Sequence, residues 1–180
     1  MADVTISSIL ERCVDVVSGH GDAEIQLALK PSDCRFALVH GQEAGHGVEI
    51  RGIVGRSPDG TLSRLGPVVT IDAEPDVLEP DTLLELALAV THSGAVGALV
   101  LSDSGPVGVV ARDALIQAIP LELLTANRER QGTPDIPSLR YQCTQCDPPT
   151  IRLLRAVQPD DQPPRCVGNF FHGPMERAAP

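Results

Sequence analysis

The sequence predicts an α+β fold built from two similar units and a small C-terminal metal-binding segment. The chain has 180 residues, which suits one domain with a small addition. Apolar stretches of strand length alternate with stretches of helical spacing, which favours a mixed class. Short segments recur at a nearly constant offset, and cysteine and histidine residues gather near the C-terminus. Since aromatic residues make up only 2%, the core must consist of Val, Leu, Ile and Ala.

The first third of the chain predicts one helix-containing segment and a pair of strands. Residues 4–17 should start extended and continue as a helix, because their later apolar residues fall on one helical face: Ile9, Leu10, Cys13, Val14 and Val17. Residues 23–30 form a short helix or strand that Pro31 stops. Two strands and their connection follow: residues 35–39, the loop 40–47 and residues 48–54.

The middle of the chain gives the clearest pattern of elements. A turn at residues 57–60 precedes an extended segment at 67–71. A helix is expected next, with Asp81 as its N-cap and Gly94 at its end. The elements after it are a central strand, a hairpin-type turn, a returning strand and a second helix: residues 95–101, 102–105, 107–110 and 112–119.

Two copies of one pattern are visible in this stretch. Ala37–Val39 recurs as Ala98–Val100, and Gly52–Arg56 recurs as Gly108–Arg112 with small apolar exchanges. Each copy reads as a helix, a strand, a loop and a strand, and the second copy adds a helix after them. This unit resembles the CBS domain, a small module of helices packed on a short sheet. Residues 78–115 are the better match.

The resemblance implies a specific architecture. CBS modules usually occur in tandem pairs related by a pseudo-two-fold axis, and such pairs often associate into dimers. We therefore expect a degenerate CBS-like pair over residues 1–122, divided into about 1–66 and 67–122. A linker at 123–139 and a zinc-ribbon-like domain at 140–180 would follow.

The resemblance also implies candidate ligand-binding residues. In nucleotide-binding members, a Gly, two apolar residues, a Thr or Ser, two variable residues and an Asp line the cleft between modules, and the Asp binds the ribose hydroxyls. In the second copy Ala111 stands where the pattern has Thr or Ser, and Asp113 comes one position early. In the first copy Pro58 stands where the pattern has Asp. The candidates for an adenosine nucleotide are thus Arg56, Ser57, Ala111, Arg112 and Asp113. Structural pairing without a ligand is the competing interpretation.

The C-terminal segment predicts a zinc site. Cys143 and Cys146 are two residues apart, and Cys166 and His172 follow at a distance that suits an intervening hairpin with a strand at residues 151–157. Zinc takes four such ligands in a tetrahedron, and its binding would supply folding energy to a segment of this size. The segment resembles a zinc ribbon, although ribbons usually have two residues between the second pair of ligands and this chain has five.

Other interpretations of these residues stay open. Cys143 and Cys146 could form a redox pair, or the cysteines could be unligated core residues. A catalytic zinc needs an open coordination position and a general base, for which Glu176 is the local candidate. Cys13 and Cys34 lie in apolar stretches and are expected to be small buried hydrophobes.

Charge and targeting signals narrow the function. The formal net charge is −10, with −11 before residue 140 and +1 in residues 140–180, whereas nucleic-acid-binding proteins usually present a basic face. No basic segment followed by an apolar run occurs at the N-terminus, and the apolar region 83–101 is broken by polar residues. We expect a cytoplasmic protein without a membrane segment.

These observations favour a non-enzymatic regulatory or scaffold protein. The CBS-like pair would mediate association, as a homodimer or with a protein partner, and could sense an adenosine nucleotide. The ribbon would hold a structural Zn²⁺ and bind a partner. The alternative is a transcription-linked or nucleic-acid-binding adaptor that acts through the ribbon.

Overall fold

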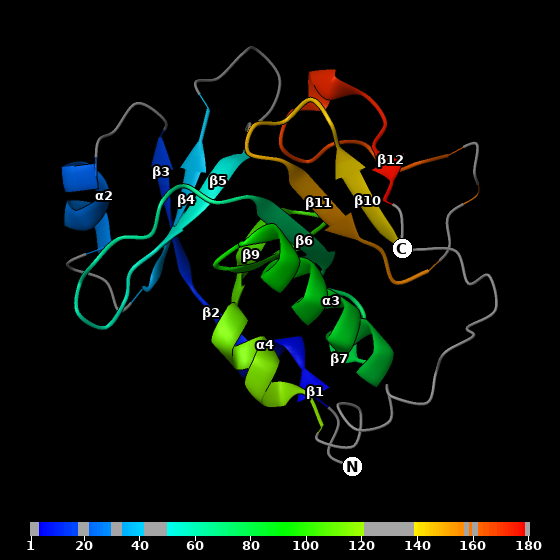
Figure 1. Ribbon diagram of the computed structural model, residues 1–180, viewed down its shortest axis with the longest axis horizontal. Helices are drawn as coiled ribbons and strands as arrows, with labels where there is room; N and C mark the ends of the chain where they lie inside the picture. The colour runs from blue at the N-terminus through cyan, green and yellow to red at the C-terminus, as the bar shows by residue number, and fades with distance from the viewer. Residues whose placement is uncertain are drawn as a thin grey trace.

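The structure is a computed structural model that describes residues 4–17, 22–29, 34–41, 50–120, 139–156, 159 and 162–178. Within these ranges the chain is an α+β protein, as its sequence predicts. Figure 1 shows a small sheet with helix α2 on the left, helices α3 and α4 below the central sheet, and a C-terminal hairpin on the right.

The first repeat is a three-stranded sheet with one helix. Its elements are β3 (Cys13–Val17), α2 (Asp22–Leu29), β4 (Phe36–His40) and β5 (Ile50–Gly55). Strand β4 lies in the middle, parallel to β3 and antiparallel to β5. Helix α2 places Ile25 and Leu29 against Val16, Val39 and Val54 of this sheet. The described part of the segment 23–30, which the sequence left open between helix and strand, is therefore a helix that includes Leu29.

The second repeat has the same topology. It consists of β6 (Val68–Asp72), α3 (Pro80–Ser93), β8 (Gly97–Ser102), β9 (Gly105–Ala111) and α4 (Arg112–Ala118). Strand β8 lies between β6, to which it is parallel, and β9, to which it is antiparallel. The register shifts at equivalent places, between Val39 and His40 in the first repeat and between Val100 and Leu101 in the second. The internal repeat in the sequence is thus a repeat in the structure.

The N-terminal segment joins the two sheets. It contains β1 (Val4–Thr5), α1 (Ile6–Ile9) and β2 (Leu10–Glu11), after which the chain enters β3. Strand β1 pairs with β7 (Val77–Leu78), and β2 pairs with β9 at the edge of the large sheet. Gly108 allows this approach, because a Cβ there would lie 2.5 Å from the carbonyl oxygen of Glu11.

The C-terminal segment extends the sheet of the second repeat. Strands β10 (Arg140–Cys143) and β11 (Thr150–Leu153) form a hairpin, and β12 (Glu176–Arg177) pairs with β10. Strand β11 also pairs in parallel with β6, so the large sheet has the order β12-β10-β11-β6-β8-β9-β2. An ion pair of 3.0 Å between Arg152 and Asp72 accompanies this pairing. The expected strand at 151–157 is shorter, since the structure ends it at Leu153.

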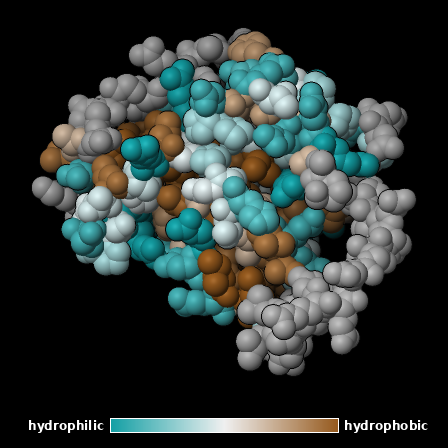
Figure 2. Space-filling model, in the orientation of Figure 1, coloured by the Kyte–Doolittle hydropathy of each residue, from teal (hydrophilic) through white to brown (hydrophobic). Residues whose placement is uncertain are grey.

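The main core lies between the large sheet and helices α3 and α4. It includes residues of the second repeat and of the C-terminal segment. Among them are Ile71, Leu86 and Val100 of the second repeat and Ile151 and Leu153 of β11. Figure 2 shows hydrophobic surface over α2 with its neighbouring strands and over α4, whereas the face over the C-terminal hairpin is mostly hydrophilic. This main core is aliphatic, as the composition requires, whereas Phe36 and Tyr141 are buried in smaller clusters.

Two sequence predictions about helices are wrong. In the segment 9–17 only Ile9, the last residue of α1, is helical, and β2 and β3 follow it. Its apolar residues fit a helical face, but their β-branched side chains also suit a strand, and pairing with β4 and β9 decides the outcome. The N-cap of α3 is Glu79 rather than Asp81, because Pro80 takes the first helical position. Gly94 ends α3 in the left-handed region, with φ of 74°.

Some expectations lie outside the described residues. The linker at 123–139 is described only at Leu139, and the loop 40–47 only at its first two residues. The domain divisions at residues 66, 122 and 140 therefore stay predictions.

Leu153→Ala should destabilise the whole chain, because the Leu153 side chain of β11 is fully buried in the main core. We expect a loss of about 2–5 kcal/mol in the free energy of unfolding, measured by urea denaturation of the full chain. The control is Leu88→Ala on α3, whose side chain is 41% exposed and whose loss should cost less than about 0.5 kcal/mol. Equal effects of the two variants would show that β11 is not part of this core.

Candidate metal centre

The four residues predicted as zinc ligands come together in one cluster. The ligand atoms of Cys143, Cys146, Cys166 and His172 all lie within 4.8 Å of one another. The Nδ1 atom of His172 is 3.2 Å from Sγ of Cys146 and 3.5 Å from Sγ of Cys143. Sγ of Cys146 is 3.4 Å from Sγ of Cys166. Cys143 and Cys166 are buried, and Cys146 and His172 are half-buried.

Two tight turns supply the cysteines. Cys143 ends β10, and the chain turns through Cys146 before it returns as β11 at Thr150. The backbone N–H of Gln145 donates a hydrogen bond to the sulfur of Cys143. The backbone N–H of Asn169 likewise donates to Sγ of Cys166 at 3.4 Å. Donors aimed at sulfur stabilise the thiolate form that a metal requires.

The five residues between Cys166 and His172 form a closed loop. Arg165 and Pro174 are paired in an antiparallel bridge, and the N–H of Cys166 donates to the carbonyl of Gly173 at 3.2 Å. Within the loop, the side chain of Asn169 accepts from the N–H of Phe171 and caps the short helix η1 (Phe170–His172). This helix turns the His172 ring back toward the cysteines. The longer spacing therefore still delivers a ligand.

The thiols differ in their acidity. Burial opposes ionisation of Cys143, but the Gln145 N–H and the neighbouring cysteines and His172 outweigh it and lower its pKa to about 7. Burial raises the pKa of Cys146 to about 12, and burial also raises the pKa of Cys166. Without a metal, a cluster with one acidic thiol and two weakly acidic thiols is the expected result, because adjacent thiolates repel one another.

The donor set fits a tetrahedral divalent metal. With Zn–S bonds of about 2.3 Å and Zn–N bonds of about 2.0–2.1 Å, tetrahedral ligand atoms lie roughly 3.6–3.8 Å apart. Three of the separations in the cluster are 3.2–3.5 Å and all lie within 4.8 Å, so these distances bracket the tetrahedral values. Three sulfurs and one imidazole are the ligands of structural zinc sites, whereas Mg²⁺ and Ca²⁺ prefer oxygen. The cluster can therefore hold a metal of the zinc type.

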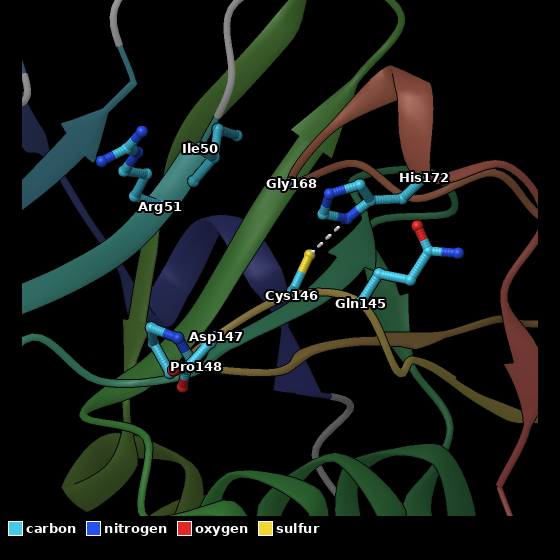
Figure 3. Close-up of a pocket in the computed structure, with 8 residues that line it drawn as sticks. All are labelled: Ile50, Arg51, Gln145, Cys146, Asp147, Pro148, Gly168 and His172. Carbon is cyan, nitrogen blue, oxygen red and sulfur yellow. Dashed lines mark hydrogen bonds between the residues drawn. The ribbon is translucent and has the colours of Figure 1, made fainter.

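A cavity of about 300 Å³ opens beside the cluster. It lies between β5 of the first repeat and the C-terminal loops, and Figure 3 shows the side chains around it. Its wall contains Cys146 and His172, but Cys143 and Cys166 do not line it. The other lining residues are Ile50, Arg51, Gln145, Asp147, Pro148 and Gly168.

The structure places the five residues predicted to contact a nucleotide at the ends of two strands, β5 and β9. Arg56 and Ser57 follow β5, while Ala111 ends β9 and Arg112 and Asp113 begin α4. The two strand ends are equivalent, because the N–H of Arg56 donates to the carbonyl of Arg35 and that of Arg112 donates to Val96. They are also adjacent, since a Cβ on Gly55 would lie 3.5 Å from Cβ of Val96.

An arginine of the chain itself contacts the predicted ribose acceptor. The Arg35 guanidinium lies 3.4 Å from the carboxylate of Asp113 and 3.0 Å from that of Glu11. It also lies 5.5 Å from the centre of the Phe36 ring. Ala111 is buried and offers no hydroxyl, whereas Arg112 is exposed. Asp113 thus has an internal cationic partner within the chain.

Sequence reasoning missed three residues that position these sites. Gly168 and Asn169 shape the loop of Cys166 and His172, and this Gly-Asn pair, which follows Cys166 after Val167, was the available signal. Arg35 connects the two repeats, but nothing in its sequence position distinguishes it. Glu176, the candidate general base, is exposed on β12 and pairs in register with Gln142.

Comparisons with solved structures give several likenesses, two of which follow. A CBS domain structure from Clostridium difficile 630 has a TM-score of 0.40 at 18% identity, covering 68% of this chain and 95% of that chain. Staphylococcus aureus OpuCA has a TM-score of 0.38 at 9% identity, covering 68% and 99%. No protein-family model and no curated protein matches the chain. Both likenesses are too low to support a functional inference.

The described helices give no membrane span. None of them is long and apolar enough to cross a bilayer.

Gly168→Ala should weaken metal binding. A Cβ at this position would lie 2.7 Å from Oγ1 of Thr150 and 3.2 Å from both Sγ of Cys146 and the carbonyl of Ile50. The loop must shift to relieve this contact, so we expect the zinc dissociation constant to rise about tenfold, measured by chelator competition. Gly66→Ala is the matched control, because its Cβ would meet nothing closer than 3.8 Å. An unchanged affinity in Gly168→Ala would contradict this role for the loop.

Proposed function

We propose that this protein is a non-enzymatic regulatory or scaffold module whose C-terminal ribbon is held together by a structural zinc ion. The main support is the convergence of the ligand atoms of Cys143, Cys146, Cys166 and His172 within 4.8 Å. Four protein ligands complete a tetrahedron and leave no open position for a substrate, which is typical of structural zinc and not of catalytic zinc. When bound, zinc supplies cross-links between the two turns.

The chain's own residues prepare the site for this role. The Gln145 and Asn169 N–H groups donate to ligand sulfurs, and Tyr141 and Met175 are buried around them in one small cluster. The ribbon has little other core of its own, so the metal would contribute much of its local stability.

The repeats are proposed to act as a CBS-like pair that mediates association. Their common topology and their close contact through Arg35 support a paired module. Association as a homodimer or with a protein partner is part of this proposal, as is a cytoplasmic location. Because the Arg35 guanidinium already pairs with the Asp113 carboxylate, we favour structural pairing over nucleotide sensing as the role of the repeats.

Purified full-length protein should contain about one zinc per chain. Cys143→Ser should lose it, because serine is a poor zinc ligand and three ligands remain. If zinc is present at about 1,000 times its dissociation constant, its removal costs about 4 kcal/mol, which lowers Tm by roughly 8–16 °C. Elemental analysis and thermal melting measure both effects.

Cys13→Ser is the control for the zinc measurement. Cys13 is a half-buried thiol whose pKa burial raises to about 11, with Asp15 and Cys34 adding to the increase, and it is not part of the cluster. It should keep its zinc. A wild-type chain without metal, or equal zinc in Cys143→Ser, would refute the structural zinc.

Nucleotide sensing has a separate test. If the cleft binds ATP, AMP or S-adenosylmethionine, that ligand should raise Tm, and Asp113→Ala should abolish the shift by removing the acceptor. Arg35→Gln keeps a polar side chain at the position but frees Asp113, and should increase the shift. Unchanged melting of all three proteins with all three ligands would leave structural pairing as the role of the repeats.

A further inference from the structure

The cavity beside the metal cluster has the features of a ligand site. Its volume of about 300 Å³ is at the lower end of the range for small-molecule pockets. It lies at an interface within the chain, with Ile50 and Arg51 of the first repeat on one side and the two metal-binding loops on the other. Since Cys143 and Cys166 do not line it, the cavity is adjacent space and not the metal position itself.

The groups around the cavity favour positive charge. Asp147, an exposed residue of the lining, carries a carboxylate, and Cys146 carries a sulfur that is a thiolate when metal is bound. On the proposed function, three thiolates, a neutral imidazole and Zn²⁺ give the cluster a formal charge of −1. The chain as a whole is at −10, which raises the local concentration of cations.

Arg51 also lines the cavity and is cationic, but its guanidinium points away from the metal cluster. Figure 3 shows its guanidinium on the far side of β5, directed away from Cys146. Asp147 lies with Pro148 on one side of the cavity, and Gln145 lies near His172 on the other. Ile50 on β5 and Pro148 beside Asp147 add apolar side chains to the lining. The arrangement suits a short apolar stem that ends in a cationic group.

We propose that this cavity binds a primary ammonium group on a short alkyl stem, with Asp147 as its principal partner. Such a group is present in a free small amine or in a lysine side chain of a partner protein. The proposal rests on the proposed function for the charge of the cluster. Bound there, the ammonium would contact both the first repeat and the metal-binding loops.

The test uses the zinc-loaded full chain and three probes of similar shape in calorimetric titrations. Butylammonium should bind, whereas butanol and butyrate should not. Asp147→Asn should weaken butylammonium binding about tenfold or more, as expected for a lost charge-assisted hydrogen bond. Arg51→Gln should strengthen binding, because it removes a nearby positive charge. Asp103→Asn, an exposed carboxylate in the β8–β9 turn, is the matched control and should change nothing.

A further arm distinguishes the two sources of the ammonium group. Nα-acetyl-lysine amide that binds more tightly than butylammonium supports a lysine side chain, and the reverse order supports a free amine. Tighter binding of butyrate than butylammonium, or unchanged binding in Asp147→Asn, overturns the proposal.

Zinc content measured on the same samples separates this proposal from the proposed function. A zinc-loaded chain that binds no butylammonium overturns the ammonium site alone. A chain without zinc overturns the proposed function and the ammonium site with it.

Discussion

The parallel pairing of β11 with β6 determines where the metal centre lies. Thr150 is in register with Val68 and Leu153 with Ile71. Strand β11 of the C-terminal hairpin is therefore paired along its length with β6, the middle strand of the large sheet. Since Cys143 pairs with Thr150 across the hairpin, the metal-binding turns lie at the Val68 end of β6. At that end they meet Ile50 of the first repeat, and the cavity forms between them.

The two repeats share a topology but differ in the segment after the last strand. In the second repeat this segment is α4, which packs against the main core through Leu115. In the first repeat Pro58 and Gly60 produce a turn, and the chain then runs back so that Leu65 covers Gly52. A Cβ on Gly52 would lie 2.6 Å from the Leu65 side chain. The loss of a helix in one copy is therefore compensated by a loop over the same sheet.

Local patterns in the sequence were enough to find most elements and all four candidate ligands. Strands such as β8 are apolar and bounded by glycine or turn residues, and the Cys-x2-Cys turn needs only neighbouring residues to form. The segment 9–17 was mispredicted because its partners, β4 and β9, are about 20 and 100 residues away and override its helical spacing.

The contacts that join the two repeats and the C-terminal segment also could not be predicted from local sequence patterns. The pairing of β11 with β6 joins segments about 80 residues apart, and the ion pair of Arg35 with Asp113 joins segments 78 residues apart. Parallel strand pairs lack a connecting turn that would reveal them in the sequence. The residue types of the metal cluster were thus predictable, whereas the cavity and the docking of the hairpin were not.

This docking changes what a bound metal stabilises. If the ribbon were attached only by a linker, the bound metal would stabilise only the residues of the ribbon. Here Ile151 and Leu153 are part of the main core, and Arg155 donates to the carbonyls of Asp72 and Val77. Loosening the metal-binding turns would therefore release the edge of β6 and reduce burial in the second repeat. Because the turns also contact Ile50, the same event would reach the first repeat, so that a ligand in the cavity and a metal in the cluster would favour one common arrangement of the chain.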